Sequence, residues 1–258
     1  MRRIRVIPAL LLNSSGGLVK TVGFGKRTYI GDPINAVKIF NEKGVDELVL
    51  LDIDAAKDGR EPNFEMIEDI ASEAFMPIGY GGGISSVDQM ALLFRCGLEK
   101  VIVSTTATEN PGMLREASDR FGAQSVVVCL DVRKTLLGKS VVTIRSNRTS
   151  TKMTPVEAAT KAVENGAGEL IVYSINRDGS YRGYDEDLLQ SVAQSVEVPV
   201  IASGGARDLS DFYSAVAESG CSAVSAGSMF FYHGKTKGVL ISYPSESELT
   251  QLYERLES

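Results

Sequence analysis

Several features are missing from this sequence, and each absence excludes a class of protein. No run of about 18 apolar residues occurs, so we expect no membrane span. The single histidine, His233, has no Cys or His near it at a metal-ligand spacing, so we expect no metal site. Cys96, Cys129 and Cys221 are odd in number and lie in apolar stretches, which indicates reduced, buried thiols in a cytoplasmic protein. The arginine-containing start, residues 1–7, lacks the small-residue cleavage site of a signal peptide.

An excess of basic residues is also absent. The chain has 27 Lys and Arg against 33 Asp and Glu, a formal net charge of −6. A nucleic-acid-binding protein would carry the opposite balance, so we expect no nucleic acid as a partner. With 258 residues, 43% of them hydrophobic, the chain is long enough to bury a full core as one large domain or two medium ones.

Short apolar, β-branched runs alternate with amphipathic segments along the chain. The expected strands are Ile4–Leu12, Glu47–Ile53, Met76–Gly81, Lys100–Ser104, Ser125–Val132, Glu169–Ser174, Val198–Ser203 and Ser222–Ala226. The expected helices are Pro33–Lys43, Phe64–Ala74, Ser86–Cys96, Pro111–Arg120, Pro155–Asn165, Glu186–Ser195, Leu209–Ser219 and Glu246–Leu256. Start signals precede three of them: Asp32-Pro33, Asn110-Pro111, and a capping box over 154–157.

Eight such strand–helix units predict a parallel α/β fold, and their number and the chain length match a TIM (β/α)8 barrel. An open doubly wound sheet is the competing layout. The sequence also repeats itself: Gly82-Gly83 recurs as Gly204-Gly205, Glu47 as Glu169, and Thr106 aligns with Ser228, all at one offset. This repeat favours the barrel, as a single domain over 1–258 with half-barrels at about 1–122 and 123–258.

Two long connections follow the first strand of each half. Residues 133–153 contain a possible hairpin at Ser140–Arg145, and a loop of this length on the catalytic face is typical of a lid or binding element. Residues 13–31 contain the interspersed glycines Gly16, Gly17, Gly23 and Gly25, which suit either a mobile flap or a plain surface loop.

The repeated glycine pairs predict two phosphate sites. Each pair sits between a strand and its helix, where backbone N–H groups and the helix N-terminus attract anions. The following units supply hydroxyl groups, and the two sets are Gly82, Gly83, Ser104 and Thr105 in one half and Gly204, Gly205, Gly227 and Ser228 in the other. Lys20 is a further candidate phosphate contact, or a plain surface lysine. The glycines could instead only permit tight turns. If both glycine pairs bind phosphate, the ligand carries two phosphate groups or resembles a ligand that carries two.

Strand ends offer the candidate acids Asp52, Asp54, Asp131 and Asp178. Carboxylates at the carboxyl ends of barrel strands are typically catalytic, and acid–base chemistry usually needs two groups on opposite sides of the reacting centre. Before Gly44 the repeat offset is slightly shorter, so that Leu11 falls at the counterpart of Asp131. One half therefore has a side chain that cannot transfer a proton where the other has a carboxylate.

These motifs together resemble, from end to end, the cyclase subunit family of imidazole glycerol phosphate synthase (HisF). The resemblance is carried by Arg5–Pro8, Asp46–Ile53, Gly81–Ile84, Arg120–Gly122, Asp131, Arg177–Gly179 and Ile201–Gly205. It implies that a glutaminase subunit (HisH-like) docks on the N-terminal face of the barrel and that its ammonia passes through the barrel to a bisphosphate. Catalysis in the family depends on two aspartates, ending strands one and five; Asp131 matches the second, and Leu11 stands at the first. No cofactor is implied.

The resemblance also implies a charged gate where ammonia enters, formed here by Arg5, Glu47, Lys100 and Glu169. The simpler interpretation is a structural salt-bridge ring. An intact gate below an altered chamber favours a paralogue that converts acetamido to acetamidino groups on a sugar in surface-polysaccharide biosynthesis, with a nucleotide-sugar type ligand. The alternatives are a genuine imidazole glycerol phosphate synthase that uses Asp54 or Asp52 as its second acid, a non-catalytic scaffold that activates a glutaminase, and, least favoured, a phosphosugar isomerase of the sister branch.

Overall fold

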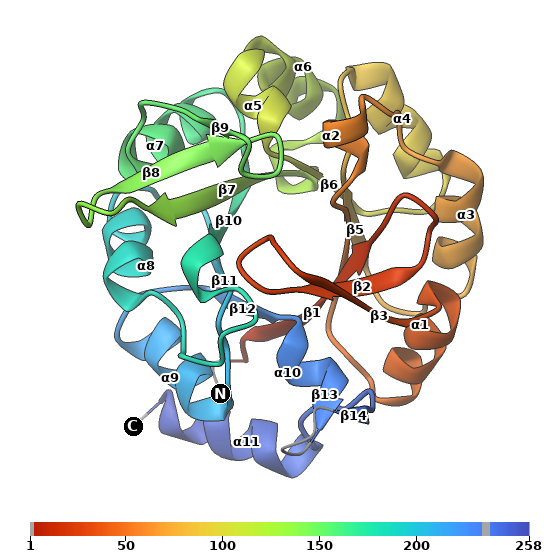
Figure 1. Ribbon diagram of the computed structural model, residues 1–258, viewed down its shortest axis with the longest axis vertical. Helices are drawn as coiled ribbons and strands as arrows, with labels where there is room; N and C mark the ends of the chain where they lie inside the picture. The colour runs from red at the N-terminus through yellow and green to blue at the C-terminus, as the bar shows by residue number, and fades with distance from the viewer. Residues whose placement is uncertain (1–2, 234–237, 258) are drawn as a thin grey trace.

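The computed structural model describes residues 3–233 and 238–257, within which eight parallel strands close into a barrel surrounded by helices (Figure 1). The strand order is β10-β11-β12-β1-β4-β5-β6-β7, and pairing of β7 with β10 closes the cylinder. The barrel strands are β1 (Arg5–Leu12), β4 (Leu48–Asp52), β5 (Ile78–Gly81), β6 (Lys100–Val103), β7 (Val126–Lys134), β10 (Glu169–Ser174), β11 (Val200–Ser203) and β12 (Ala223–Ala226). The TIM barrel is confirmed, and the closure excludes an open sheet.

The helices that cover the barrel lie within a few residues of their expected positions. They are α1 (Pro33–Glu42), α3 (Phe64–Ser72), α4 (Val87–Arg95), α6 (Gly112–Phe121), α7 (Pro155–Glu164), α8 (Glu186–Ala193), α9 (Leu209–Ala217) and α11 (Glu246–Arg255). Shorter turns lie between them: α2 (Ala55–Asp58), α5 (Thr105–Glu109), α10 (Ser228–Phe231), η1 (Ala123–Ser125) and η2 (Ile175–Arg177), with a small β13–β14 pair (Tyr232–His233, Gly238–Val239). None of the helices described has the length and apolar character needed to cross a bilayer.

Two of the three expected helix starts are confirmed. Thr154 and Glu157 form a reciprocal capping box on α7, and the Asp32 carboxylate accepts the backbone N–H of Asn35 at 2.9 Å on α1. The third is wrong in detail, because α6 begins one residue later, at Gly112. The backbone of Pro111 already has helical angles, and Asn110 accepts the N–H of Met113 through its carbonyl oxygen instead of its side chain.

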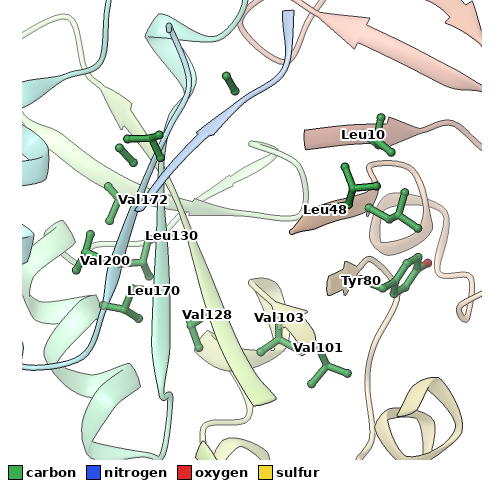
Figure 2. Close-up of a cluster of buried hydrophobic side chains, with 14 of the residues drawn as sticks. Leu10, Leu48, Tyr80, Val101, Val103, Val128, Leu130, Leu170, Val172 and Val200 are labelled. Atoms are coloured by element: carbon green, nitrogen blue, oxygen red, sulfur yellow. The ribbon is translucent and has the colours of Figure 1, made fainter. Parts of the chain in front are cut away.

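Side chains along each strand point alternately to the inside and the outside of the barrel, which gives the protein two hydrophobic cores. Side chains on the inner face fill the barrel itself, and they are Ile7, Val49, Ile102, Val127, Cys129, Ile171, Tyr173, Ile201 and Ala223. The alternate residues point outward and pack under the helices, as Leu10, Leu48, Tyr80, Val101, Val128 and Leu170 do in Figure 2. Because successive side chains point to opposite faces, one parity of each strand decides which residues can meet inside the barrel.

Each half-barrel carries an antiparallel hairpin on its first strand. In the first half, β2 (Leu18–Thr21) pairs with the end of β1 and with β3 (Arg27–Gly31). In the second, β8 (Ser140–Ile144) pairs with the extended β7 and with β9 (Thr149–Ser150). The hairpin expected at Ser140–Arg145 is a single strand there, β8, which forms its hairpins with β7 and β9. Residues 13–31 fold into a hairpin where the sequence indicated a flap or loop. Figure 1 shows both hairpins at the mouth of the barrel.

Candidate functional site

The carboxyl ends of the strands surround a cavity of about 430 Å³, a size typical of small-molecule sites. Leu11, Leu51, Ile102, Cys129 and Tyr173 give it an apolar floor, which follows from their inward parity on five different strands. Its walls add carboxylates, glycines, hydroxyl groups and arginines, among them Asp131, Asp52, Gly82, Gly83, Ser104, Thr105, Thr106, Arg27, Arg60 and Arg145.

Asp131, on β7, is one of the residues that line this cavity. Its Oδ2 accepts a hydrogen bond from Ser104 Oγ at 3.2 Å, and its Oδ1 accepts one from Cys129 Sγ at 3.6 Å. Desolvation by the surrounding barrel raises the pKa of Asp131 to about 6, and these two hydrogen bonds only partly oppose the shift. A carboxyl group with a pKa near neutrality can both accept and donate a proton at physiological pH.

Leu11 faces the same cavity. It is 5% exposed, lies on the inward face of β1 together with Arg5 and Ile7, and pairs with Leu51 of β4. The structure therefore places a leucine, which offers no proton and no hydrogen bond, within the chamber that contains Asp131.

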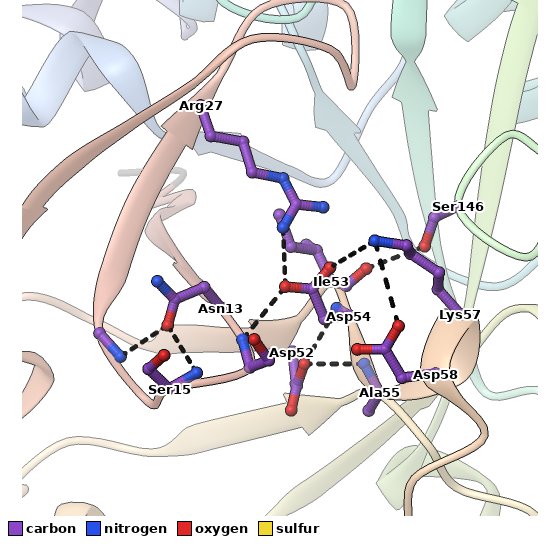
Figure 3. A network of polar contacts seen from close by, with 12 residues as sticks. Asn13, Ser15, Arg27, Asp52, Ile53, Asp54, Ala55, Lys57, Asp58 and Ser146 are labelled. Atoms are coloured by element: carbon purple, nitrogen blue, oxygen red, sulfur yellow. Dashed lines mark hydrogen bonds and ion pairs between the residues drawn. The ribbon is translucent and has the colours of Figure 1, made fainter.

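The other strand-end acids of the first half serve local structure (Figure 3). Asp52 lines the cavity, but its Oδ1 accepts the backbone N–H groups of Asp54 and Ala55 at 3.0 and 2.9 Å, and Arg60 lies 3.3 Å away. Asp54 is 3% exposed and lies outside the cavity lining. A hydrogen bond from Arg27 at 2.7 Å is the main reason why the pKa of Asp54 is lowered. Neither carboxylate is free to pair with Asp131 across the chamber.

Asp178, the fourth predicted acid, holds the first hairpin in place. Its Oδ2 accepts the hydroxyl of Thr21 at 2.7 Å and the backbone N–H of Phe24 at 3.1 Å, and its Oδ1 accepts the hydroxyl of Tyr173 at 2.7 Å. Asp178 is buried and lines a second, smaller cavity instead of the chamber of Asp131. These contacts give Asp178 a structural role.

The first predicted phosphate cradle, formed by Gly82, Gly83, Ser104 and Thr105, opens directly into the large cavity. Gly83 has φ +71°, and a Cβ there would collide with the carbonyl oxygen of Arg60. This close approach is sufficient to explain the glycine, so the glycine alone does not identify an anion site. The position of the cradle, with hydroxyl groups from the start of α5 beside it, is what suits a phosphate.

The second predicted cradle, formed by Gly204, Gly205, Gly227 and Ser228, lines the smaller cavity, which has a volume of about 20 Å³. Lys20 also lines it and is buried, not a surface lysine. Its Nζ donates to the carbonyl oxygen of Ala9 at 2.6 Å and lies 4.5 Å from the ring centroid of Phe231. Desolvation lowers the pKa of Lys20 to about 7, against the opposing charge of Asp178.

The four predicted gate residues meet at the amino end of the barrel and form a closed ring of alternating charge. Lys100 Nζ lies 3.0 Å from Glu47 and 2.7 Å from Glu169, and Arg5 bonds Glu47 at 2.6 Å and also Glu169. The two glutamate side chains are 4% and 5% exposed, so each depends on both cations for compensation. We refer to these residues as the four-charge ring. The geometry fits both a structural ring and a gate.

Sequence reasoning missed three contributors to the site. Tyr173 shares inward parity with Glu169 and Ile171, a signal that could have identified it. Phe24, at the hairpin turn, packs edge-on against the Tyr173 ring with centroids 5.2 Å apart. Arg145 lines the cavity from a turn in which residues 145–147 all have positive φ without being glycine, and no local sequence signal predicts that conformation.

A closed (β/α)8 barrel with a cavity at its carboxyl end, a carboxylate of raised pKa and paired charges at its amino end defines an enzyme-type barrel subunit. Residues 5–237 match the family described as histidine biosynthesis protein. The chain belongs to this family and is HisF-like.

Several relatives share most of its length. A protein of Pseudomonas aeruginosa with the provisional name imidazole glycerol phosphate synthase subunit hisF2 is 47% identical over 96% of this chain and 99% of its own. A protein of Leptospira interrogans, provisionally named as a HisF subunit, is 44% identical over 98% of this chain and 100% of its own. The imidazole glycerol phosphate synthase subunit HisF of Streptomyces griseus is 40% identical over 89% of this chain and 90% of its own.

Proposed function

We propose that this chain is the ammonia-receiving synthase subunit of a glutamine amidotransferase, and that it supports the conversion of an acetamido to an acetamidino group on a sugar in surface-polysaccharide biosynthesis. The observation that carries the proposal is the contrast between the two ends of the barrel. The four-charge ring is complete, whereas Leu11 occupies the chamber position where the repeat offers a counterpart of Asp131.

The barrel interior suits the delivery of neutral ammonia. The inward side chains above the four-charge ring include the apolar residues Ile7, Val49, Val127 and Ile171. An apolar lining disfavours ammonium and water, so nitrogen that enters as ammonia would reach the chamber unprotonated. A glutaminase subunit on the N-terminal face would supply it, since the ring lies at that face.

In the chamber, Asp131 would be the group that moves protons. In the proposed conversion ammonia adds to the acetamido carbonyl carbon, the carbonyl oxygen leaves as water, and nitrogen takes its place. A carboxyl group with a pKa of about 6 can carry protons from the attacking nitrogen to the leaving oxygen, one as ammonia adds and one as water leaves, so that the two protons lost by nitrogen become those of the water. Asp131 alone is assigned this role. Of the other carboxylates that line the chamber, Asp52 is paired with Arg60, Glu109 is paired with Arg145, and Glu61 is exposed.

A genuine imidazole glycerol phosphate synthase is the second candidate, favoured by the names of the relatives. It would need a second acid, and Asp52 and Asp54 are both engaged by arginines. Supplying the histidine-pathway bisphosphate with ammonium salts and following its absorbance tests this candidate directly. We expect wild-type turnover at or near the detection limit, and turnover by Leu11→Asp at least about a hundredfold above that limit if only that group is missing.

The test of the proposal uses the chain together with its glutaminase partner, glutamine carrying heavy nitrogen in its amide, and an acetamido nucleotide sugar. We expect heavy nitrogen in the sugar by mass spectrometry, and loss of this signal in Asp131→Asn. If the complex hydrolyses glutamine and the sugar gains no nitrogen, the chain is a scaffold that only activates the glutaminase. Rapid wild-type turnover of the bisphosphate would contradict the proposal in favour of the second candidate.

A further inference from the structure

The two phosphate cradles predicted from the repeat are not equivalent in the folded chain. The first opens into the cavity of about 430 Å³, whereas the second lines a cavity of about 20 Å³. A space of that size holds roughly one water molecule and is too small for a phosphate group. The asymmetry matters because a bisphosphate that spans the barrel needs both cradles open at once.

Side chains of the protein itself fill the second cradle. A Cβ placed on Gly204 would lie 3.2 Å from Cε1 of Tyr173, so the tyrosine ring rests against that backbone. A Cβ placed on Gly227 would lie 2.7 Å from the amine of Lys20. The hydroxyl of Tyr181 donates to the carbonyl oxygen of Ser228 at 3.0 Å. Tyr173 and Lys20 therefore crowd the backbone of two glycines of the predicted phosphate site, and Tyr181 contacts a third position, Ser228, through its carbonyl oxygen.

A wall divides the second cradle from the chamber of Asp131. Leu11 and Tyr173 line both cavities, so they form the partition between them. The Phe24 ring covers Tyr173 from the hairpin side, with the ring planes at 62°. Both aromatic residues are tied to Asp178, Tyr173 through its hydroxyl at 2.7 Å and Phe24 through its backbone N–H at 3.1 Å. The partition is thus fixed by packing and by hydrogen bonds.

We propose that Tyr173, together with Leu11 and Phe24, makes this barrel selective for a ligand anchored by a single phosphate or diphosphate group in the cradle of Gly82 and Gly83. The same wall excludes a ligand whose two separate phosphates span the barrel. The inference deepens the proposed function, on which it rests for the nature of the ligand, because a nucleotide sugar carries its phosphates as one contiguous group between nucleoside and sugar and has no second, distant phosphate. It assigns to Tyr173 a role in specificity and none in proton transfer.

The experiment compares two probes by calorimetry on the full chain without any glutaminase. The probes are the histidine-pathway bisphosphate and ribose 5-phosphate, which carries a single phosphate. For the wild type we expect dissociation constants that agree within about threefold, since only one phosphate of the bisphosphate can be held. In Tyr173→Ala we expect the bisphosphate to bind at least about tenfold tighter than ribose 5-phosphate, because the second cradle then adds an intramolecular contact.

Tyr173→Phe is the matched control. It keeps the ring against Gly204 and removes only the bond to Asp178, so we expect the wild-type ratio of the two constants. Leu11→Ala opens the same wall from the other side and serves if Tyr173→Ala does not fold. Tighter binding of the bisphosphate to the wild type, an unchanged ratio in the opened variants, or no binding of ribose 5-phosphate to the wild type would each overturn the inference. None of these outcomes depends on nitrogen transfer, so a failure of this inference can be distinguished from a failure of the proposed function.

Discussion

Replacing Asp131 by asparagine should stabilise the protein at neutral pH and leave its stability unchanged in acid. In the folded chain the pKa of Asp131 is about 6, against an ordinary value of 3.8. Folding therefore favours the protonated carboxyl group, and the wild type loses stability as the pH rises from about 4 to about 6. Above that window the loss is complete, and asparagine, which carries no charge, avoids it.

The magnitude follows from the shift. Each pKa unit corresponds to about 1.4 kcal/mol, so a shift of this size amounts to at most about 3 kcal/mol. Because Asp131 faces a cavity that water can enter, we expect a smaller difference, of about 1 to 3 kcal/mol. The asparagine amide oxygen can still accept a hydrogen bond from Ser104 or Cys129, so little of this gain should be lost.

Urea unfolding of the wild type and Asp131→Asn, at several pH values between about 4 and 8, measures the effect. The difference in the free energy of unfolding should be near zero at the acidic end and should grow to its full value above about pH 6. Asp88→Asn is the control, because it makes the same substitution at a side chain that is 91% exposed. A difference that does not vary with pH, or a variant that is less stable at pH 8, would refute the reasoning that burial sets this pKa.

Two further predictions concern the amino end of the barrel and the second cradle. Lys100→Met should lower the free energy of unfolding by about 3 to 5 kcal/mol at neutral pH, because it leaves two buried glutamates with one cation. Lys38→Met, which removes a cation from an exposed pair, should lower it by less than about 1 kcal/mol. Equal effects of the two substitutions in urea unfolding would argue against a tightly coupled ring. Gly205→Ala should lower the free energy of unfolding by about 3 kcal/mol or more, because the added Cβ would meet the carbonyl oxygen of Gly183. Gly44 also has a positive φ but has open space around it, so Gly44→Ala should lower it by only about 1 kcal/mol. Similar losses of thermal stability in the two variants would show that small shifts of the backbone remove the clash at Gly205.

Much of the fold can be predicted from the sequence because its signals are local. The apolar runs of β1 and β7, the capping box at Thr154 and the alternation of strands and helices act within a few residues of one another. Strand parity carries the prediction from one end of a strand to the other. Arg5 and Leu11 have the same parity in β1, so both are predicted to face the interior of the barrel. The internal repeat then indicates which positions of the two halves correspond.

The tertiary structure decided what happens at the barrel mouth. The two glycine pairs look alike in the sequence, but only the fold brings Lys20, Tyr173 and Tyr181 onto the second one and leaves the first one open. These contacts join residues far apart in the chain, as does the hydrogen bond between Thr21 and Asp178, so no local pattern encodes them.

The roles of the carboxylates are likewise determined partly by the sequence and partly by the fold. The sequence by itself determined which aspartates end strands and that Leu11 takes the place corresponding to Asp131 in the repeat. Only the folded barrel decided that Asp52 is held by an arginine, that Asp178 anchors a hairpin, and that Asp131 keeps a raised pKa. The reason is physical: periodicity acts along the chain, whereas desolvation and hydrogen bonding depend on which distant side chains the closed barrel brings together.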